Sequence, residues 1–212
     1  MLIAFDTATP LVTVALHDGT SVVAERSSER PMKHGEHLQP MIDEVVREAG
    51  LTPADLTAIA VGAGPGPFTG LRVGLVAART MGFALDIPVY AVCSLDVLAI
   101  EAFDSGVVEG DFLVATDARR KEVYVASYSA GVRVDGPAVL KPADAATTLP
   151  VVGEGAHLYP EAFPNAVGPL MPSAGWLARA VAGERAELLD PDPLYLRRPD
   201  AVVSPKATRS LL

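Results

Sequence analysis

Both halves of this chain begin with the same order of apolar segments and tight turns. In the first half, the apolar run Leu2 to Phe5 ends at Asp6, and an alternating segment, an Asp-Gly turn and a return segment follow. A shift of 111 positions places Asp6 on Asp117, where FLVATDARRKEVYVASYSAGVRVDG repeats this order. A continuous apolar run is typical of a buried strand, and alternation around a glycine turn is typical of a hairpin. The repeat therefore favours two lobes that each open with three antiparallel strands.

Helical and extended patterns alternate between these two openings. Apolar residues recur at helical spacing from His37 to Ala49, and Gly50 ends that helix. Strands are predicted over 56–61 and 89–92, and helices over 71–85 and 94–102. The segment 105–110 is the predicted joint, which divides the chain into an N-terminal lobe, 1–106, and a smaller C-terminal lobe with a basic tail, 107–212. The predicted fold class is α/β, with a mixed sheet flanked by helices in each lobe.

Charge and composition limit the kinds of partner. The formal net charge of −9 disfavours a protein that binds nucleic acid unaided, because such proteins usually present a basic face. The single cysteine, Cys93, excludes an internal disulfide. No segment is long and apolar enough to span a membrane, and the N-terminus lacks a secretory signal, so a cytoplasmic protein is expected. Basic residues gather near the end, where a solvated tail is favoured over a nucleic-acid contact; they are Arg197, Arg198, Lys206 and Arg209.

A glycine-rich loop joins a strand to a helix in the segment AVGAGPGPFTGLRVGL, residues 60–75. Such loops can bind phosphate through free backbone N–H groups at a helix N-terminus. Here Pro65 and Pro67 have no N–H to donate, and the Lys and Ser or Thr of a P-loop are missing. A tight turn capped by Thr69 explains the loop without a ligand. We therefore interpret it as a structural turn.

Within that segment, GPGPFTGLRVG resembles the GPGSFTGLRIG block of TsaB proteins. The resemblance extends to FDTATP near the start, to HGEHLQP, to TDARRKEVYVASY and to PLYLRRPDAV, so that it covers nearly the whole chain. Pro67 departs from the serine that is common in the family, a change expected to stiffen the loop. The resemblance implies an actin-like, ribonuclease H-like fold with duplicated lobes. It also implies a role in forming threonylcarbamoyladenosine at adenosine 37 of tRNAs.

The resemblance further implies a protein without a catalytic centre of its own. TsaB proteins are related to the catalytic subunit TsaD, in which two histidines spaced H-x-x-x-H hold the active-site metal. The matching positions here are Ser94 and Leu98, and a leucine cannot bind a metal ion. The implied function is that of a non-catalytic subunit that organises a TsaD-type paralogue. A TsaE-type ATPase would join the assembly, tRNA would be reached only through the complex, and the chain alone would form a homodimer.

Asp6, Thr7 and Asp117 match the positions at which actin-like kinases hold magnesium-bound phosphate. Their side chains can also cap local N–H groups at strand ends, so both interpretations stay open for their ancestry. Few residues follow Lys141, too few for an adenosine-clamping subdomain, so we interpret these three as degenerate remnants with no cofactor bound. The alternative function is a small ATP-dependent phosphotransferase that uses these residues, and a peptidase is the least supported. No metal site is expected, and the HGEH segment, residues 34–37, is interpreted as a solvated helix start rather than a zinc site.

The predicted helix over 71–85 is apolar on nearly all sides and so requires cover on more than one side. Its small residues Gly74, Ala78 and Gly82 form a stripe that lets another helix approach closely. Internal packing explains such a stripe as well as a partner does, but the resemblance favours a partner, because TsaB proteins are expected to pair through their first two helices. The expected interface residues are Leu38, Met41, Val45, Leu71, Gly74, Leu75, Ala78 and Gly82.

Overall fold

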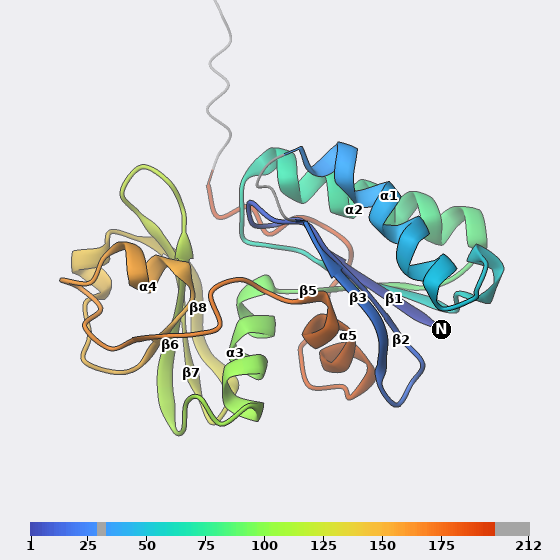
Figure 1. Cartoon of the computed structure of the whole chain (residues 1–212). Coiled ribbons are helices and arrows are strands. Elements are labelled where there is room, and N and C mark those ends of the chain that lie inside the picture. The colour runs from blue at the N-terminus through green and yellow to red at the C-terminus, as the bar shows by residue number, and fades with distance from the viewer. Residues whose placement is uncertain (29–32, 198–212) are drawn as a thin grey trace, which may run out of the picture.

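Two five-stranded mixed sheets form the framework of the chain, for which the computed structural model describes residues 1–28 and 33–197 (Figure 1). The first sheet has the order β3-β2-β1-β4-β5 and the second the order β8-β7-β6-β9-β10. In each, the first three strands are antiparallel and the last two add in parallel. The shared topology confirms the predicted α/β fold with two similar lobes. The strands are Leu2–Asp6 (β1), Thr13–His17 (β2), Val22–Ser27 (β3), Ala58–Gly62 (β4), Val89–Val92 (β5), Asp111–Asp117 (β6), Val123–Ser129 (β7), Val132–Leu140 (β8), Val151–Val152 (β9) and Ala166–Val167 (β10).

Helices cover both faces of the first sheet. Figure 1 shows α1 and α2 side by side on one face and α5 on the other. No helix among residues 1–28 and 33–197 has the length and apolar character to cross a membrane. The helices are His34–Glu48 (α1), Phe68–Leu85 (α2), Ser94–Asp104 (α3), Glu154–Leu158 (α4) and Ala174–Ala182 (α5), with short 3₁₀ helices at Pro53–Asp55 and Pro142–Ala145.

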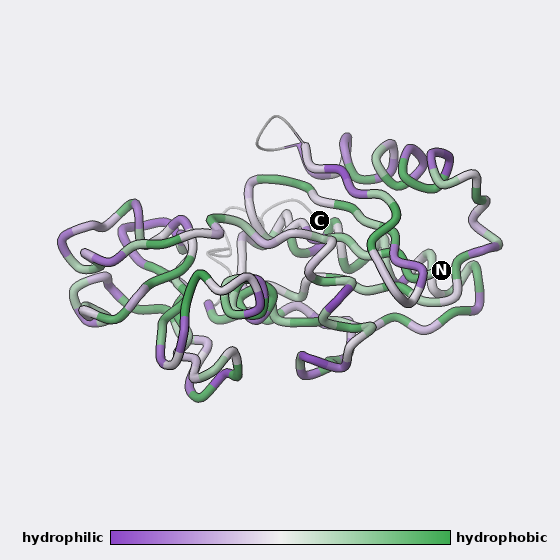
Figure 2. Tube along the Cα trace, turned by 60° about the horizontal axis from the view of Figure 1, so that its bottom comes forward, coloured by the Kyte–Doolittle hydropathy of each residue, from purple (hydrophilic) through white to green (hydrophobic). Residues whose placement is uncertain are grey.

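The helix predicted from His37 begins three residues earlier, at His34, and ends before Gly50, as expected from the left-handed φ of 69° at that glycine. Its apolar residues occupy one face, so the turns of α1 alternate between hydrophilic and hydrophobic colours in Figure 2. This face packs on β1, β2 and β4 together with the inner face of α2. The first lobe thus follows its sequence pattern closely.

Helix α3 lies between the two lobes and packs apolar residues against both of them. Leu98 packs with Phe112 of β6 in the core of the second lobe. Val97, the residue before it, packs with Leu177 of α5 on the first sheet. Both Val97 and Leu98 are fully buried. A helix that is covered by a lobe on each of two sides requires apolar residues on both sides.

Two later segments return from the second lobe to the first. Helix α5 packs its residue Leu177 against the face of the first sheet that α1 and α2 leave uncovered. Farther along, Leu189 and Ala91 of β5 exchange backbone hydrogen bonds, and the Leu194 N–H donates to the Ala63 carbonyl at 2.9 Å. A boundary between residues 106 and 107 thus separates the two sheets but not the helices that cover them. The division into lobes 1–106 and 107–212 stays a prediction.

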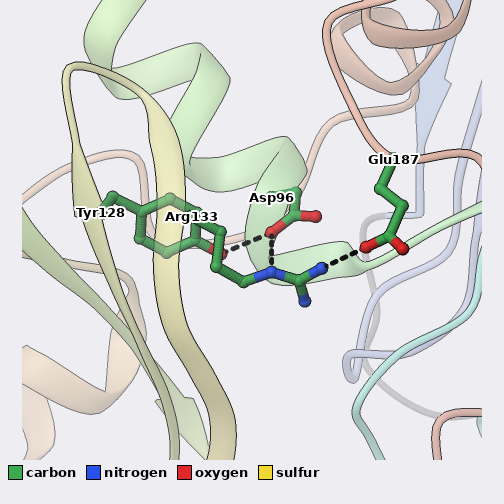
Figure 3. A network of polar contacts seen from close by, with 4 residues as sticks. All are labelled: Asp96, Tyr128, Arg133 and Glu187. Atoms are coloured by element: carbon green, nitrogen blue, oxygen red, sulfur yellow. Dashed lines mark hydrogen bonds and ion pairs between the residues drawn. The ribbon is translucent and has the colours of Figure 1, made fainter.

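A polar network ties α3 to the second sheet and to the returning segment (Figure 3). The Tyr128 hydroxyl donates to Asp96 Oδ1 at 2.7 Å, and Arg133 Nε lies 3.6 Å from the same oxygen. A second nitrogen of Arg133 contacts Glu187 Oε2 at 2.8 Å. Burial raises the pKa values of both the Asp96 carboxyl and the Tyr128 hydroxyl. The network links three elements that are distant in sequence, which helps to fix the angle between the lobes.

Candidate functional site

Asp6 ends strand β1 at the place expected for a phosphate-site remnant, but its carboxylate binds groups of its own chain. The Ser94 hydroxyl donates to Oδ2 at 2.6 Å, and the Ala8 N–H donates to Oδ1 at 2.6 Å. The side chain is 1% exposed. Burial raises the pKa of this carboxyl, and the hydrogen bonds from Ser94 and Ala8 partly oppose that rise. A β-carbon at Gly62 would lie 1.9 Å from Oδ2, so only glycine leaves room for the carboxylate there.

The neighbouring residue, Thr7, joins strand β1 to helix α2. Its hydroxyl donates to the Gly70 carbonyl at 2.8 Å and accepts from the Gly74 N–H at 3.1 Å. An undisturbed α-helix would join these two backbone groups directly, so the hydroxyl bridges one step of the helical ladder. A β-carbon at position 74 would lie 2.5 Å from Thr7 Oγ1, which explains the glycine. Thr7 therefore has both of its hydrogen-bonding functions occupied inside the protein.

The glycine-rich loop lies directly on the end of the first hairpin. A β-carbon at Gly66 would lie 2.1 Å from the Ala8 carbonyl oxygen, so the two backbones are in close contact. The loop enters α2 through Pro67, which is the residue before the helix, whereas Thr69 lies within the first turn. The predicted cap by Thr69 is therefore wrong, because the helix begins earlier than its apolar pattern indicates. In this loop the glycines permit close packing of the backbone.

The two aspartate-bearing turns approach each other, but little space separates them. The gap lined by Pro65, Asp117 and Glu154 has a volume of about 10 Å³, which is about the volume for one water molecule. Asp117 Oδ1 accepts the Arg119 N–H at 2.7 Å, and the Arg119 guanidinium lies 3.0 Å from the other oxygen. Burial raises the pKa of Glu154, and the Asp117 charge adds to the rise. A cleft of about 280 Å³ opens beside the gap, and neither space is lined by Asp6 or Thr7.

Ser94 and Leu98, which the resemblance matches to metal-binding histidines, have structural contacts. Ser94 donates to Asp6, and its oxygen also lies 3.3 Å from the Gly64 N–H, whereas Leu98 belongs to the core of the second lobe. In the HGEH segment, His34 Nε2 lies 2.7 Å from the Thr9 carbonyl oxygen. Within residues 1–28 and 33–197, no three His, Cys, Asp or Glu side chains converge as metal ligands would.

The residues expected at the partner interface all face the interior of the first lobe, and the interface with a partner stays a prediction. Ala78 is fully buried, and a β-carbon at Gly82 would lie 2.4 Å from Val89 Cγ2 of strand β5. The small-residue stripe therefore lets α2 approach its own sheet, not a second chain. The same inner faces of α1 and α2 carry the other expected residues, which are Leu38, Met41, Val45, Leu71, Gly74 and Leu75.

The opposite face of α2 exposes apolar side chains that sequence reasoning missed. Phe83 is 92% exposed and Val76 is 61% exposed, and they lie seven residues, or about two turns, apart on the same face. Arg72 and Arg79 flank them, with Arg72 Nε donating to the Tyr195 hydroxyl at 2.9 Å and Arg79 paired with Asp192. The signal for this face was present in the sequence, since the helix is apolar on nearly all sides. We call Val76 and Phe83 the α2 outer face.

Comparison with known proteins shows one consistent family. The family model described as "TsaD: tRNA N6-adenosine threonylcarbamoyltransferase" matches residues 23–168. The chain is 47% identical over 207 residues to an uncharacterized protein of Mycobacterium tuberculosis, with 94% of this chain and 93% of the relative covered. It is 35% identical over 129 residues to the tRNA threonylcarbamoyladenosine biosynthesis protein TsaB of Bacillus subtilis, with 60% of this chain and 54% of that protein covered.

A solved structure gives the same result in three dimensions. YeaZ from Pseudomonas aeruginosa superimposes with a TM-score of 0.76 at 33% sequence identity, over 92% of this chain and 99% of that one. The resemblance in the FTGLRVG and DARRKEVY blocks thus extends to the whole fold. Because the family model spans more than half of the chain, the chain belongs to the family described as TsaD, tRNA N6-adenosine threonylcarbamoyltransferase, and within it is a TsaB-like, YeaZ-like protein.

Proposed function

We propose that this chain is a non-catalytic subunit of the machinery that forms threonylcarbamoyladenosine in tRNA, and that it acts by binding and organising a TsaD-type catalytic paralogue. The names of its TsaB relatives support the pathway. The non-catalytic role is supported by the packing at Asp6 and Thr7, where each side-chain oxygen binds a group of the chain itself. Neither Asp6 nor Thr7 is therefore left available to bind a phosphate or to activate a nucleophile.

The observation that carries the proposal is the small gap between the two aspartate-bearing turns. The gap measures about 10 Å³ and the cleft beside it about 280 Å³, whereas sites for small molecules typically measure about 300–1,000 Å³. To admit a nucleotide phosphate, the glycine-rich loop would have to separate from the Ala8 carbonyl that it touches. Nucleotide binding by the isolated chain is therefore expected to be weak or absent. A calorimetric dissociation constant near or below about 1 μM for ATP would favour the alternative, an ATP-dependent phosphotransferase.

The α2 outer face is the surface that we assign to the TsaD-type partner, in place of the buried stripe. A phenylalanine that is 92% exposed gains free energy when a partner covers it, and aromatic side chains often dominate binding at interfaces. The same face would form the homodimer when the chain is alone. A TsaE-type ATPase would join the assembled pair, and tRNA would be reached through it.

Paired variants test this surface. Val76→Asp places a charge on the α2 outer face, and Val134→Asp places the same charge on strand β8, where the valine is 63% exposed compared with 61% at Val76. Both variants should keep the melting temperature of the parent, because neither residue is buried. Only Val76→Asp, and likewise Phe83→Ser, should lose co-elution with the TsaD-type protein on a sizing column. A loss of about 2 kcal/mol or more, roughly thirtyfold in affinity, is expected for Phe83→Ser. If Val76→Asp and Phe83→Ser both co-elute with the TsaD-type protein as fully as the parent does, this face is not the interface.

Loss of the protein from its native cell should also lower threonylcarbamoyladenosine in tRNA. Mass spectrometry of nucleosides from a depletion strain measures this directly. The parent chain should restore the modification and Phe83→Ser should not, because the partner would not be organised. Unchanged modification after depletion would overturn the proposed pathway itself.

A further inference from the structure

A concavity with three basic residues in its lining lies on the second lobe, away from the α2 outer face. Its volume is about 870 Å³, and its lining comes from three separate segments. The loop between β6 and β7 contributes Arg120 and Lys121, and the residue after β8 contributes Lys141. The rest of the lining is mainly apolar and includes one acidic residue, Glu161; it consists of Pro142, Ala143 and Ala146 and of residues 158–162, at and after the end of α4. In a chain with a formal charge of −9, three cations around one concavity are a local reversal of charge.

The backbone that carries the first two cations is in an unfavourable conformation. Arg119, Arg120 and Lys121 have φ values of 60°, 55° and 61°, which places three consecutive side chains in the left-handed region. This region costs a residue with a β-carbon roughly 1–2 kcal/mol, whereas glycine adopts it freely. A turn with no function beyond reversing the chain would favour glycine at these positions. Three long basic side chains stand there instead.

Surrounding contacts hold this loop in place. Asp117 accepts the Arg119 N–H at 2.7 Å, and the Ala118 N–H donates to the Glu122 carbonyl at 3.0 Å. From the returning segment, Arg197 donates to the Ala118 carbonyl at 2.8 Å. Strained residues persist when their surroundings over-determine them, and they cluster at sites that hold ligands. The loop therefore presents its basic side chains from a fixed backbone.

We propose that Arg120, Lys121 and Lys141 form a contact surface for the phosphate backbone of RNA. The cations come from two segments, the β6–β7 loop and the residue after β8, around a broad concavity, which suits successive phosphates along a strand better than one small anion. Three such contacts on an acidic chain position an RNA but bind it weakly without other help. The inference rests on the proposed function, because the TsaD-type partner would supply the remaining affinity and this surface would set the orientation of the tRNA.

The test measures binding of an unmodified tRNA transcript to the chain paired with its TsaD-type partner. The double variant Arg120→Gly/Lys121→Gly removes two charges and also relieves the left-handed strain. The matched control is Lys33→Gly, which removes one charge at another left-handed residue, with φ of 68°, before α1 on the first lobe. Both variants should melt at or above the temperature of the parent. The double variant should bind RNA at least tenfold more weakly, and Lys33→Gly should bind within twofold of the parent.

Salt dependence identifies the kind of contact. Between about 50 and 200 mM salt, the slope of log affinity against log salt should fall by about 1.5 in the double variant, as expected for two lost phosphate contacts. Lys121→Gln/Lys141→Gln, which leaves residues 119 and 120 unchanged, should give the same fall in slope. Unchanged affinity and slope in both double variants would overturn the proposal. So would RNA binding that is unaffected while inorganic phosphate binds the parent and not the variants, since the site would then take a small anion.

Failure of the proposed function has a different signature. In that case the parent chain does not co-elute with the TsaD-type protein on the sizing column. The chain alone at about 50 mM salt then still tests the surface, because phosphate contacts are strongest at low salt. Weaker RNA binding by the two double variants than by Lys33→Gly would support the surface, and equal binding by all of them would overturn it.

Discussion

Replacing Glu101 with glutamine should stabilise the protein above neutral pH. Glu101 lies on α3, and its Oε2 is buried without a hydrogen-bond partner. Burial raises the pKa of this carboxyl to about 7 from its usual 4.5, the nearby Glu25 carboxylate adds to the rise, and Arg179 opposes it. Glu25 cannot turn away easily, because its Oε1 accepts from the Ser173 hydroxyl at 2.8 Å and from the Gly175 N–H at 3.0 Å. The charged form of Glu101 is therefore unfavourable in the folded chain.

The direction of the pH dependence follows from this rise. Because the folded-state pKa of Glu101 lies above the unfolded-state value, the folded chain binds more protons than the unfolded chain between pH 4.5 and about 7. The stabilising contribution is complete below pH 4.5 and is lost as the pH rises through about 7. The full difference corresponds to roughly 3 kcal/mol. Since the side chain is only partly buried and solvent screens it, we expect about 1–2 kcal/mol.

Urea unfolding at pH 5 and pH 8, followed by circular dichroism, measures this contribution. Glu101→Gln should raise the free energy of unfolding by about 1–2 kcal/mol at pH 8 and change it little at pH 5. The free energy of unfolding of the variant should still depend on pH to some extent, because burial also raises the pKa values of Asp6, Asp96 and Glu154. Glu44→Gln, at an exposed position of α1, is the control and should match the parent at both pH values. If the free energy of unfolding of Glu101→Gln changes between pH 5 and pH 8 as much as that of the parent, the reasoning is refuted.

Ala78→Leu should lower the melting temperature in calorimetry, because overpacking between α2 and its own sheet costs about 1–3 kcal/mol. A melting temperature equal to that of the parent would indicate that Ala78 lies at a contact between chains and not inside the lobe. Ser94→Ala should destabilise the fold by about 1–3 kcal/mol, since the buried Asp6 carboxylate loses a donor, yet it should restore tRNA modification in a depletion strain. A stable Ser94→Ala chain that fails to restore it would reveal chemistry at this site. Tyr128→Phe should lower the free energy of unfolding in urea by about 1 kcal/mol, and an unchanged value would show that Asp96 does not depend on this donor.

Local patterns in the sequence were sufficient for most of the first lobe. The apolar run before Asp6, the alternation after it and the helical spacing that ends at Gly50 each depend on residues close together in the chain. Each element formed, and the helix begins three residues before its predicted start. The repeat at Asp117 had the same local basis. Helix α5 was not predicted, although Ser173 caps it; its packing on the first sheet rather than the second has no signal in the nearby sequence.

The candidate site required tertiary information for the same reason. The sequence placed Asp6 and Thr7 at a strand end, but their partners, Ser94 and Gly74, lie far along the chain. Without those distances, a carboxylate that binds its own chain and one that is free for a phosphate have the same local signature.

By itself, the sequence determined the family, the duplicated order of strands and the periodicity of the helices, because these follow from short-range chemistry and from motifs. Only the tertiary structure decided which face of α2 is covered. The stripe containing Gly74 and Ala78 fits equally a sheet of the same chain and a helix of another, and the close approach of Thr7 and Val61 to Gly74 selects the first. The exposed position of Phe83 follows from that selection, since a helix that packs one face on its own sheet must present the opposite face outward.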